Sequence, residues 1–148
     1  RYQFQWWALS LIDARPFGDK KKGADTGIDG FYYFNDGGAT KKAVVQVKSG
    51  KVGVSQIREL NAVVEREKAE MGFFLSLEPA TRQMKEEAAK NGAYNDSFGN
   101  KYPKTQIFTV EEIFNGKEPE TPQKVPIFNF NQNTKMNGGR KGDQKILP

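Results

Sequence analysis

The chain has 148 residues, enough for one domain with a hydrophobic core, and its 36% hydrophobic and 28% charged residues are typical of a soluble protein. It contains neither Cys nor His, which excludes disulfides, thiolate or imidazole catalysis, and the zinc sites built from those ligands. The formal net charge of +5 is compatible with a polyanionic partner. Catalysis would therefore rest on carboxylates, amides, hydroxyls and amines, which favours hard cations held by oxygen ligands.

The chain shows no secretion signal, and no apolar stretch approaches the roughly 18 to 20 residues that cross a bilayer. We therefore expect a cytoplasmic protein. Because the chain begins with Arg1 rather than Met, we also expect it to be a piece of something larger.

The first third of the chain predicts a helix followed by a hairpin. Apolar residues recur at helical spacing over residues 2–13, until Pro16 prevents the helix from continuing. A loop rich in Gly, Lys and Asp follows. Residues 28–34 and 41–48 then have the composition of strands, and the Asp-Gly-Gly sequence at 36–38 between them is typical of a hairpin turn.

The middle of the chain alternates between helices and strands. A period near 3.6 predicts a helix that is capped by Ser55 and continues to about Met71. Residues 73–77 are almost all apolar, which favours a central strand buried on both faces. Thr81 then caps a second helix that ends at Asn91-Gly92.

A last strand over 105–108 leads into a short helix that begins with a capping box at Thr109. We expect the domain to occupy residues 1–116. The tail, 117–148, is rich in Pro, Asn, Gly and Lys, and we expect it to be partly docked or disordered, with only 125–130 able to dock on the body.

The order of these elements predicts an α/β fold with a mixed central sheet flanked by helices. The hairpin strands would be antiparallel, whereas the later strands, joined by helical crossovers, would be parallel to one another.

One acid and one strand carry the candidate chemistry. Asp29 precedes the first hairpin strand, while Gln46 and Lys48, two positions apart on the second, share one face. Asp29, the Gln46 side-chain oxygen and the Val47 backbone carbonyl could hold Mg²⁺, which commonly takes only one or two carboxylates. Lys48 could position or activate a water, or stabilise a charged transition state. This set predicts metal-dependent phosphodiester hydrolysis.

Other readings of these residues stay open. Asp29 could be a turn acid and Lys48 a solvated lysine at a strand end. Lysines near the site are either DNA contacts or solvated charges. These candidate DNA-binding residues are Lys20, Lys21, Lys22 and Lys51.

The segment Gly23-Ala24-Asp25-Thr26-Gly27-Ile28-Asp29-Gly30, followed by Gln46-Val47-Lys48, resembles the Mrr-type branch of the PD-(D/E)XK restriction-endonuclease superfamily. In that branch Gln replaces the usual second acid. Segments around Phe4–Ala8, Ile57–Leu60, Val64–Lys68 and Leu77–Pro79 also resemble nuclease-like domains found beside DNA methyltransferases of restriction–modification systems. The resemblance covers roughly residues 2–116.

This resemblance implies an α-β-β-β-α-β nuclease core and a Mg²⁺-dependent DNA endonuclease, with Mn²⁺ as a substitute. It makes Asp29 the metal-binding acid, Gln46 the second ligand and Lys48 the catalytic lysine. Asp25 matches a further acid, either a ligand or a residue that orders the glycine-rich loop. The implied partners are DNA and, as candidates, a DNA methyltransferase domain or subunit and a second copy of the chain.

The chain departs from many relatives on its first helix, where they carry a metal-reaching Glu. Here Gln3 and Gln5 occupy that region, and no Glu precedes Glu59. This departure predicts weak metal affinity or lost activity if Asp25 does not compensate. Two alternatives follow: a DNA-binding module of the same fold that does not cut, and a structure-specific nuclease that resolves DNA junctions.

Overall fold

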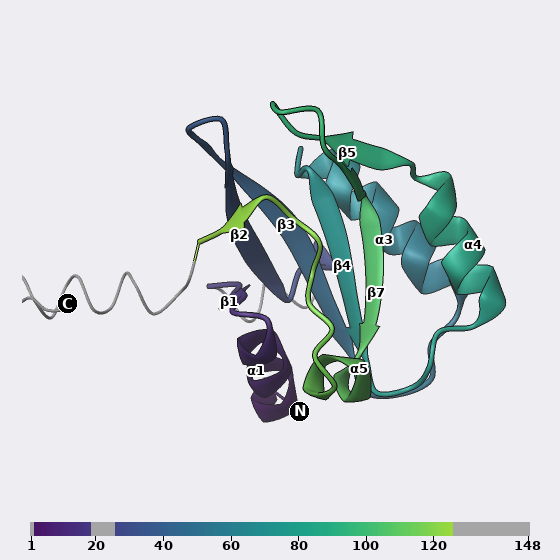
Figure 1. The fold of residues 1–148 in the computed structure, drawn as a ribbon. Helices are drawn as coiled ribbons and strands as arrows, with labels where there is room; N and C mark the ends of the chain where they lie inside the picture. The colour runs from purple at the N-terminus through teal and green to yellow at the C-terminus, as the bar shows by residue number, and fades with distance from the viewer. Residues whose placement is uncertain (1, 19–25, 126–148) are drawn as a thin grey trace, which may run out of the picture.

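The structure is a computed structural model that describes residues 2–18 and 26–125 (Figure 1). In chain order its elements are α1 (Tyr2–Leu11), β1 (Arg15–Pro16), β2 (Gly30–Asp36), β3 (Ala39–Lys48), α3 (Val54–Arg66), β4 (Met71–Ser76), α4 (Arg82–Lys90), β5 (Ala93–Asn95), β6 (Lys101–Pro103), β7 (Thr105–Thr109), α5 (Val110–Phe114) and β8 (Gln123–Lys124). None of the described helices is long and apolar enough to cross a membrane.

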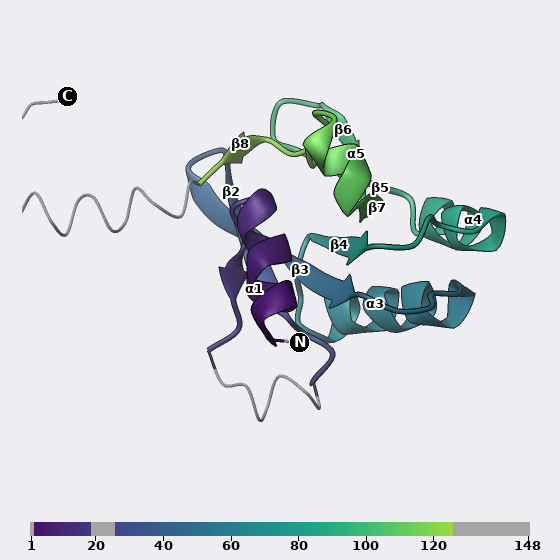
Figure 2. The same ribbon diagram turned by 90° about the horizontal axis from the view of Figure 1, so that it is seen from below.

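The central sheet is mixed, with strand order β1-β2-β3-β4-β7 and with β8 paired to β2. Strand β2 is antiparallel to both β1 and β3, whereas β3, β4 and β7 run parallel to one another. Figure 2 shows α3 and α4 side by side and apart from α1. The run α1-β1-β2-β3-α3-β4 has the expected α-β-β-β-α-β order, so the predicted fold class is confirmed.

Two hydrophobic clusters hold helices to the sheet, one on each face. Leu9 of α1 packs in the cluster that contains Val45, and Leu60 of α3 packs in the cluster that contains Val44. Neighbouring residues of β3 thus serve opposite faces, as the alternation of a strand requires. The strand that bears the candidate site is therefore held rigidly between α1 and α3.

The six residues of β4 are all buried, which confirms the predicted central strand. At Gly72 a Cβ would stand 2.7 Å from a methyl carbon of Val64 and 3.0 Å from Leu60 Cγ. Only a glycine lets α3 approach the sheet this closely, because any side chain would push the helix away.

The hairpin between β2 and β3 is also confirmed. Its register pairs Asp36 with Ala39, so the turn consists of Gly37 and Gly38. Their φ angles are +58° and +84°. Positive φ at both central residues is the requirement of a type I′ turn, whose twist matches that of the flanking strands. The turn fixes the register that brings the start of β2 beside the end of β3.

The predicted helix starts are confirmed for α4 and α5 but shifted for α3. Thr81 and Thr109 accept hydrogen bonds from backbone amides three residues on, as N-caps do. Helix α3 is capped at Gly53 rather than Ser55, and the Gln56 side chain accepts a hydrogen bond from the Gly53 N–H over 2.7 Å.

Helix α3 also ends earlier than predicted, at Arg66 instead of about Met71. Lys68 adopts a φ of +55°, a left-handed conformation that stops the helix. The chain can then reverse, and Met71 becomes the first residue of β4. Met71 is apolar and in phase with the buried face of α3, so helical periodicity alone could not show that it belongs to β4.

The hairpin of β5 and β6 was not predicted from the sequence. Its turn is organised by Asp96, whose Oδ1 accepts hydrogen bonds from the N–H groups of Phe98 (2.9 Å) and Asn100 (2.8 Å). Asp36, in the hairpin of β2 and β3, accepts hydrogen bonds from Ser97 N–H (2.9 Å) and Oγ (2.7 Å). The two hairpin ends are thus tied together.

Residues 117–125, here called the C-terminal strap, run from α5 to the edge of the sheet at β2 (Figure 1). The buried side chain of Gln106 accepts a hydrogen bond from the Glu120 N–H and donates one to the Glu120 carbonyl, both over 2.9 Å. Further along, Lys124 pairs with Asp13 over 2.7 Å. The docked strap thus begins upstream of the segment 125–130 that was expected to dock and includes its first residue, Val125, whose N–H donates to the Tyr33 carbonyl over 2.9 Å; residues 126–130 lie outside the described residues.

Candidate active site

Asp29 is held in place by both its backbone and its side chain. Its N–H donates to the Val45 carbonyl over 3.0 Å, and its carbonyl accepts from the Phe17 N–H over 2.9 Å. The carboxylate accepts from the Val47 N–H at Oδ2 (2.7 Å) and from Gln5 Nε2 at Oδ1 (3.0 Å). The acid thus lies where β2 begins and β3 ends, beside the strand that carries Gln46.

Gln46 is only 3% exposed. Its Nε2 donates to the Gly27 carbonyl over 2.6 Å, whereas its Oε1 is buried and has no hydrogen-bond partner among the residues that the structure describes. An unsatisfied buried acceptor costs about 1–3 kcal/mol, so a water or a cation at this oxygen would be favourable. The side chain therefore has the free oxygen that a neutral metal ligand needs.

The side chains of Gln46 and of an acid on α3, Glu59, both lie close to Gly27. A Cβ on Gly27 would lie 3.2 Å from Gln46 Nε2 and 3.3 Å from Glu59 Oε2. Gly27 also has a φ of +76°, which disfavours any other residue there. Glu59 was not predicted as a site residue, because on the sequence it belongs to the exposed face of a helix; only the packing of α3 against Gly27 brings it here.

Lys48 is the last residue of β3 and is half-buried. Strand alternation places it on the same face as Gln46, as predicted. Its carbonyl accepts a hydrogen bond from the Leu77 N–H over 3.2 Å, which anchors the end of β3 to the loop after β4. Among the described residues its ammonium group has no ion pair or hydrogen bond, so it remains available to a ligand.

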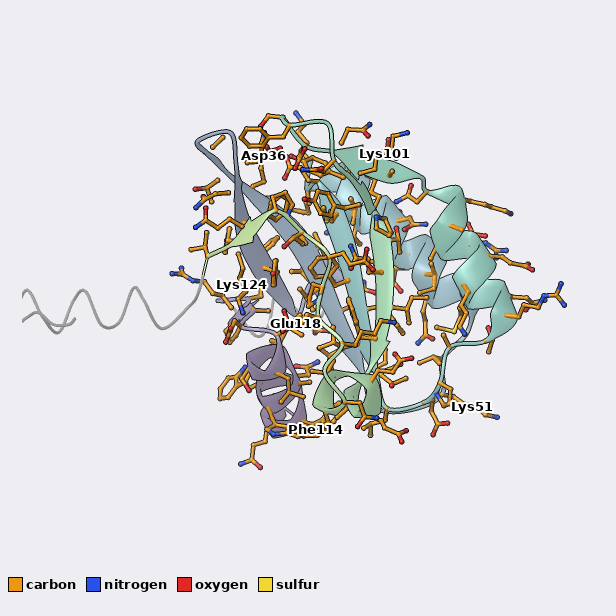
Figure 3. The ribbon with its side chains drawn as sticks, viewed as in Figure 1. Asp36, Lys51, Lys101, Phe114, Glu118 and Lys124 are labelled. Carbon is orange, nitrogen blue, oxygen red and sulfur yellow. The ribbon has the colours of Figure 1, made fainter. Side chains whose placement is uncertain are left out.

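The other predicted site residues are distributed differently. Val47 contributes its N–H to Asp29, and the role of its carbonyl as a ligand stays a prediction. Lys51 is exposed, and Figure 3 places it at the same end of the molecule as Phe114, the last residue of α5. Asp25 and the lysines at 20–22 lie outside the described residues.

The two glutamines of α1 have different surroundings. Gln3 is exposed, whereas Gln5 is half-buried and reaches the Asp29 carboxylate. Gln5 lies four residues before Leu9 and seven before Ile12, both buried against the sheet. Gln5 was not predicted as a site residue; its position in phase with the apolar helix face is a sequence signal that could have distinguished it from Gln3.

The side-chain oxygens of Asp29 and Gln46 have the ligand chemistry that suits a hard, largely hydrated cation. Within residues 2–18 and 26–125, no three acidic side chains lie close enough together to enclose a metal ion. The orphaned Gln46 Oε1 and the Asp29 carboxylate nevertheless match the preference of Mg²⁺ for few protein oxygens and several waters. A metal that needs nitrogen or sulfur ligands has none available, because the chain lacks Cys and His.

Comparison with known proteins gives a match to a protein family. A protein-family model, Mrr_cat, described as "Restriction endonuclease", matches residues 2–95, more than half of the chain. The matched part extends from α1 to β5 and includes Gln5, Asp29, Gln46 and Lys48. Neither a search of curated proteins nor a search of solved structures found a match.

Proposed function

The chain belongs to the Mrr-type restriction endonuclease family, and from this premise we propose that it is a metal-dependent endonuclease domain that hydrolyses phosphodiester bonds of DNA. The family identifies it as a restriction-endonuclease-type nuclease with DNA as its substrate. Divalent metals are generally used by such enzymes. The observation that carries the finer proposal is the buried oxygen of Gln46, which lacks a hydrogen-bond partner among the described residues; the next residue along β3, Val47, donates its N–H to the Asp29 carboxylate.

In this proposal Asp29 and Gln46 hold Mg²⁺, with Mn²⁺ as a substitute, and Asp25 and the Val47 carbonyl are further candidate ligands. When bound, the metal would neutralise charge at the scissile phosphate and lower the pKa of a coordinated water. Lys48, on the same face as Gln46, would orient the attacking water or stabilise the charge that develops on the phosphate. Lys51 and the lysines at 20–22 would contact DNA.

The biological setting is a further part of the proposal. The resemblance to nuclease domains beside DNA methyltransferases supports a role in a restriction–modification system. It also supports a methyltransferase domain or subunit as partner, and a homodimer as the assembly that would cut both strands.

The test is nicking of supercoiled plasmid by the protein with Mg²⁺ or Mn²⁺. We expect nicking that stops with EDTA and falls at least about 100-fold in Lys48→Ala, the scale of losing charge stabilisation at the transition state. Lys85→Ala is the matched control, because Lys85 is an exposed lysine on α4, far along the chain from the site. Nicking that persists in Lys48→Ala would overturn the assignment.

A second candidate function is a DNA-binding module of the same fold that does not cut. It is favoured by the Gln5 amide, a hydrogen-bond donor at the carboxylate where a second acid would assist metal binding. DNA binding without nicking in either metal would support this reading.

A further inference from the structure

Three aromatic side chains, Phe17, Phe31 and Tyr33, form a row along the edge of the sheet next to the candidate site; we call it the aromatic row. The ring centroids of Phe17 and Phe31 are 5.9 Å apart, and those of Phe31 and Tyr33 are 6.2 Å apart. All three side chains are half-buried. They therefore leave part of each ring open to solvent.

The row shares a sheet face with the proposed catalytic residues. Phe31 pairs with Val44 in the register of β2 and β3, and strand alternation puts Gln46 and Lys48 on the same side as Val44. At its other end the row begins beside the acid, because Phe17 donates its N–H to the Asp29 carbonyl. A ligand lying on the row would thus lead directly to the site.

Two cations are interleaved with the rings. The Arg15 guanidinium carbon lies 5.7 Å from the centre of the Tyr33 ring, and Lys42 Nζ lies 5.0 Å from the centre of the Phe31 ring. The nearby Glu70 accepts a hydrogen bond from the Lys42 backbone N–H and lies 4.0 Å from Lys41 Nζ. The row is consequently positive and aromatic, and complementary to a nucleic acid strand.

Packing accounts for only part of the row. Phe17 and Phe31 pack at the margin of the cluster under α3, but Tyr33 belongs to neither hydrophobic cluster. Its hydroxyl makes no hydrogen bond to any residue that the structure describes. Helix α3 lies against β3 and β4, and Figure 2 shows it away from β2, so none of the labelled helices covers the face of the row at this edge of the sheet. A core role does not explain an aromatic ring with a free hydroxyl beneath an arginine.

We propose that the aromatic row binds unpaired bases of the DNA substrate, with Arg15 and Lys42 on the phosphates, and guides the strand to Asp29. Stacking on ring faces requires bases released from the duplex, because paired bases present only their edges. The preferred substrate would then be single-stranded DNA or DNA with an unpaired segment beside the cleavage point. The part of the inference in which the DNA strand is guided to Asp29 rests on the proposed function, whereas the binding of unpaired bases to the aromatic row does not.

The experiment measures fluorescence anisotropy of a labelled oligothymidine and of a labelled duplex of equal length, with the full chain in EDTA. We expect Tyr33→Leu to weaken single-strand binding about tenfold, the scale of losing one stacked base. Tyr33→Phe keeps the ring and should bind as the wild type does. Phe114→Leu, which removes a 64% exposed ring on α5, is the matched control and should leave binding unchanged.

Lys42→Ala supplies an independent readout. Removing one phosphate contact should flatten the dependence of log affinity on log salt concentration by about 0.7 for a single strand. Thermal unfolding of each variant establishes that it is folded.

Single-strand affinity that is unchanged in Tyr33→Leu, or reduced equally in Phe114→Leu, would overturn the inference. An equal loss for single strand and duplex would also overturn it, since the ring would then not read unpaired bases. Because no hydrolysis occurs in EDTA, the binding experiment and the plasmid-nicking experiment test different proposals. Single-strand binding that depends on Tyr33 would support the aromatic row even if the protein did not nick plasmid. Plasmid nicking by a protein whose binding does not depend on Tyr33 would overturn the aromatic row and leave the proposed function intact.

Discussion

Gln5 Nε2 donates a hydrogen bond to Oδ1 of Asp29 over 3.0 Å, and so connects α1 to the acid that precedes β2. The opposite oxygen of the same carboxylate accepts from the Val47 N–H. Each oxygen of Asp29 therefore already has at least one protein donor, and a cation must share the carboxylate with these donors. Because Gln5 contacts the proposed metal-binding carboxylate directly, a substitution of Gln5 should change the affinity for metal.

Gln5→Glu should strengthen binding of divalent cations. A second carboxylate beside Asp29 repels it when no metal is present and supplies another hard oxygen ligand when metal is bound. We expect Mn²⁺ affinity to rise about tenfold, measured by calorimetric titration, and thermal stability to become more dependent on metal. Gln3→Glu is the control, because Gln3 is exposed on the same helix. Equal Mn²⁺ affinity in the wild type and Gln5→Glu would contradict the proposed metal position.

Gln46→Leu should separate stability from function. The substitution removes a hydrogen bond to Gly27 and, at the same time, a buried oxygen that has no partner. Because these effects oppose each other, the free energy of unfolding should change by less than about 1 kcal/mol, measured with urea. Plasmid nicking should nevertheless be lost together with the ligand. A variant that is as active as the wild type would show that Gln46 is a structural residue only.

Acid should loosen the junction of the two hairpins. Hydrogen bonds from the Tyr94 hydroxyl and from Ser97 hold the pKa of Asp36 below its ordinary value. Burial opposes the shift at Asp96, but hydrogen bonds from Asn100 and Phe98 hold the pKa of that carboxyl low as well. Both groups stabilise the fold when ionised. Their contribution is thus complete above the ordinary pKa of Asp, about 3.9, and is lost as the pH falls through the lowered values in the folded protein.

The corresponding measurement is the thermal midpoint between pH 7 and pH 2. Asp36→Asn should lower the midpoint at pH 7 and show a smaller further decrease on acidification than the wild type. Tyr94→Phe removes the hydroxyl that donates a hydrogen bond to Asp36, and it should also make the decrease of the midpoint on acidification smaller than in the wild type. An identical pH profile for the wild type and Asp36→Asn would argue against this role.

The C-terminal strap should be part of the folding unit. A chain that ends at residue 116 would lose both hydrogen bonds between the buried Gln106 side chain and the Glu120 backbone, and the contact between Tyr32 and Thr121. We expect its free energy of unfolding to be about 3 kcal/mol lower than that of a chain ending at residue 125, measured with urea. Equal stability of the two chains would place the domain boundary at 116.

Several features could be predicted from residues that are close together in the chain. Thr81 and Thr109 cap their helices, and Gly37-Gly38 closes the hairpin, because each depends on the conformational preferences of a few neighbours. The shared face of Gln46 and Lys48 follows from strand alternation alone. The match to the Mrr-type family confirms the resemblance seen in the motif, and the roles of its residues stay predictions.

The amino-acid sequence by itself predicted the main helices and strands, the mixed sheet and a set of candidate metal-binding residues whose roles stay a prediction. Only the tertiary structure decided that Gln5 reaches Asp29, that Glu59 approaches Gly27, and that Gln106 holds Glu120. The physical reason is that these contacts join residues far apart in the chain, whose meeting depends on the packing of whole helices and strands. Local conformational preferences act over a few residues and therefore do not determine which distant residues come into contact.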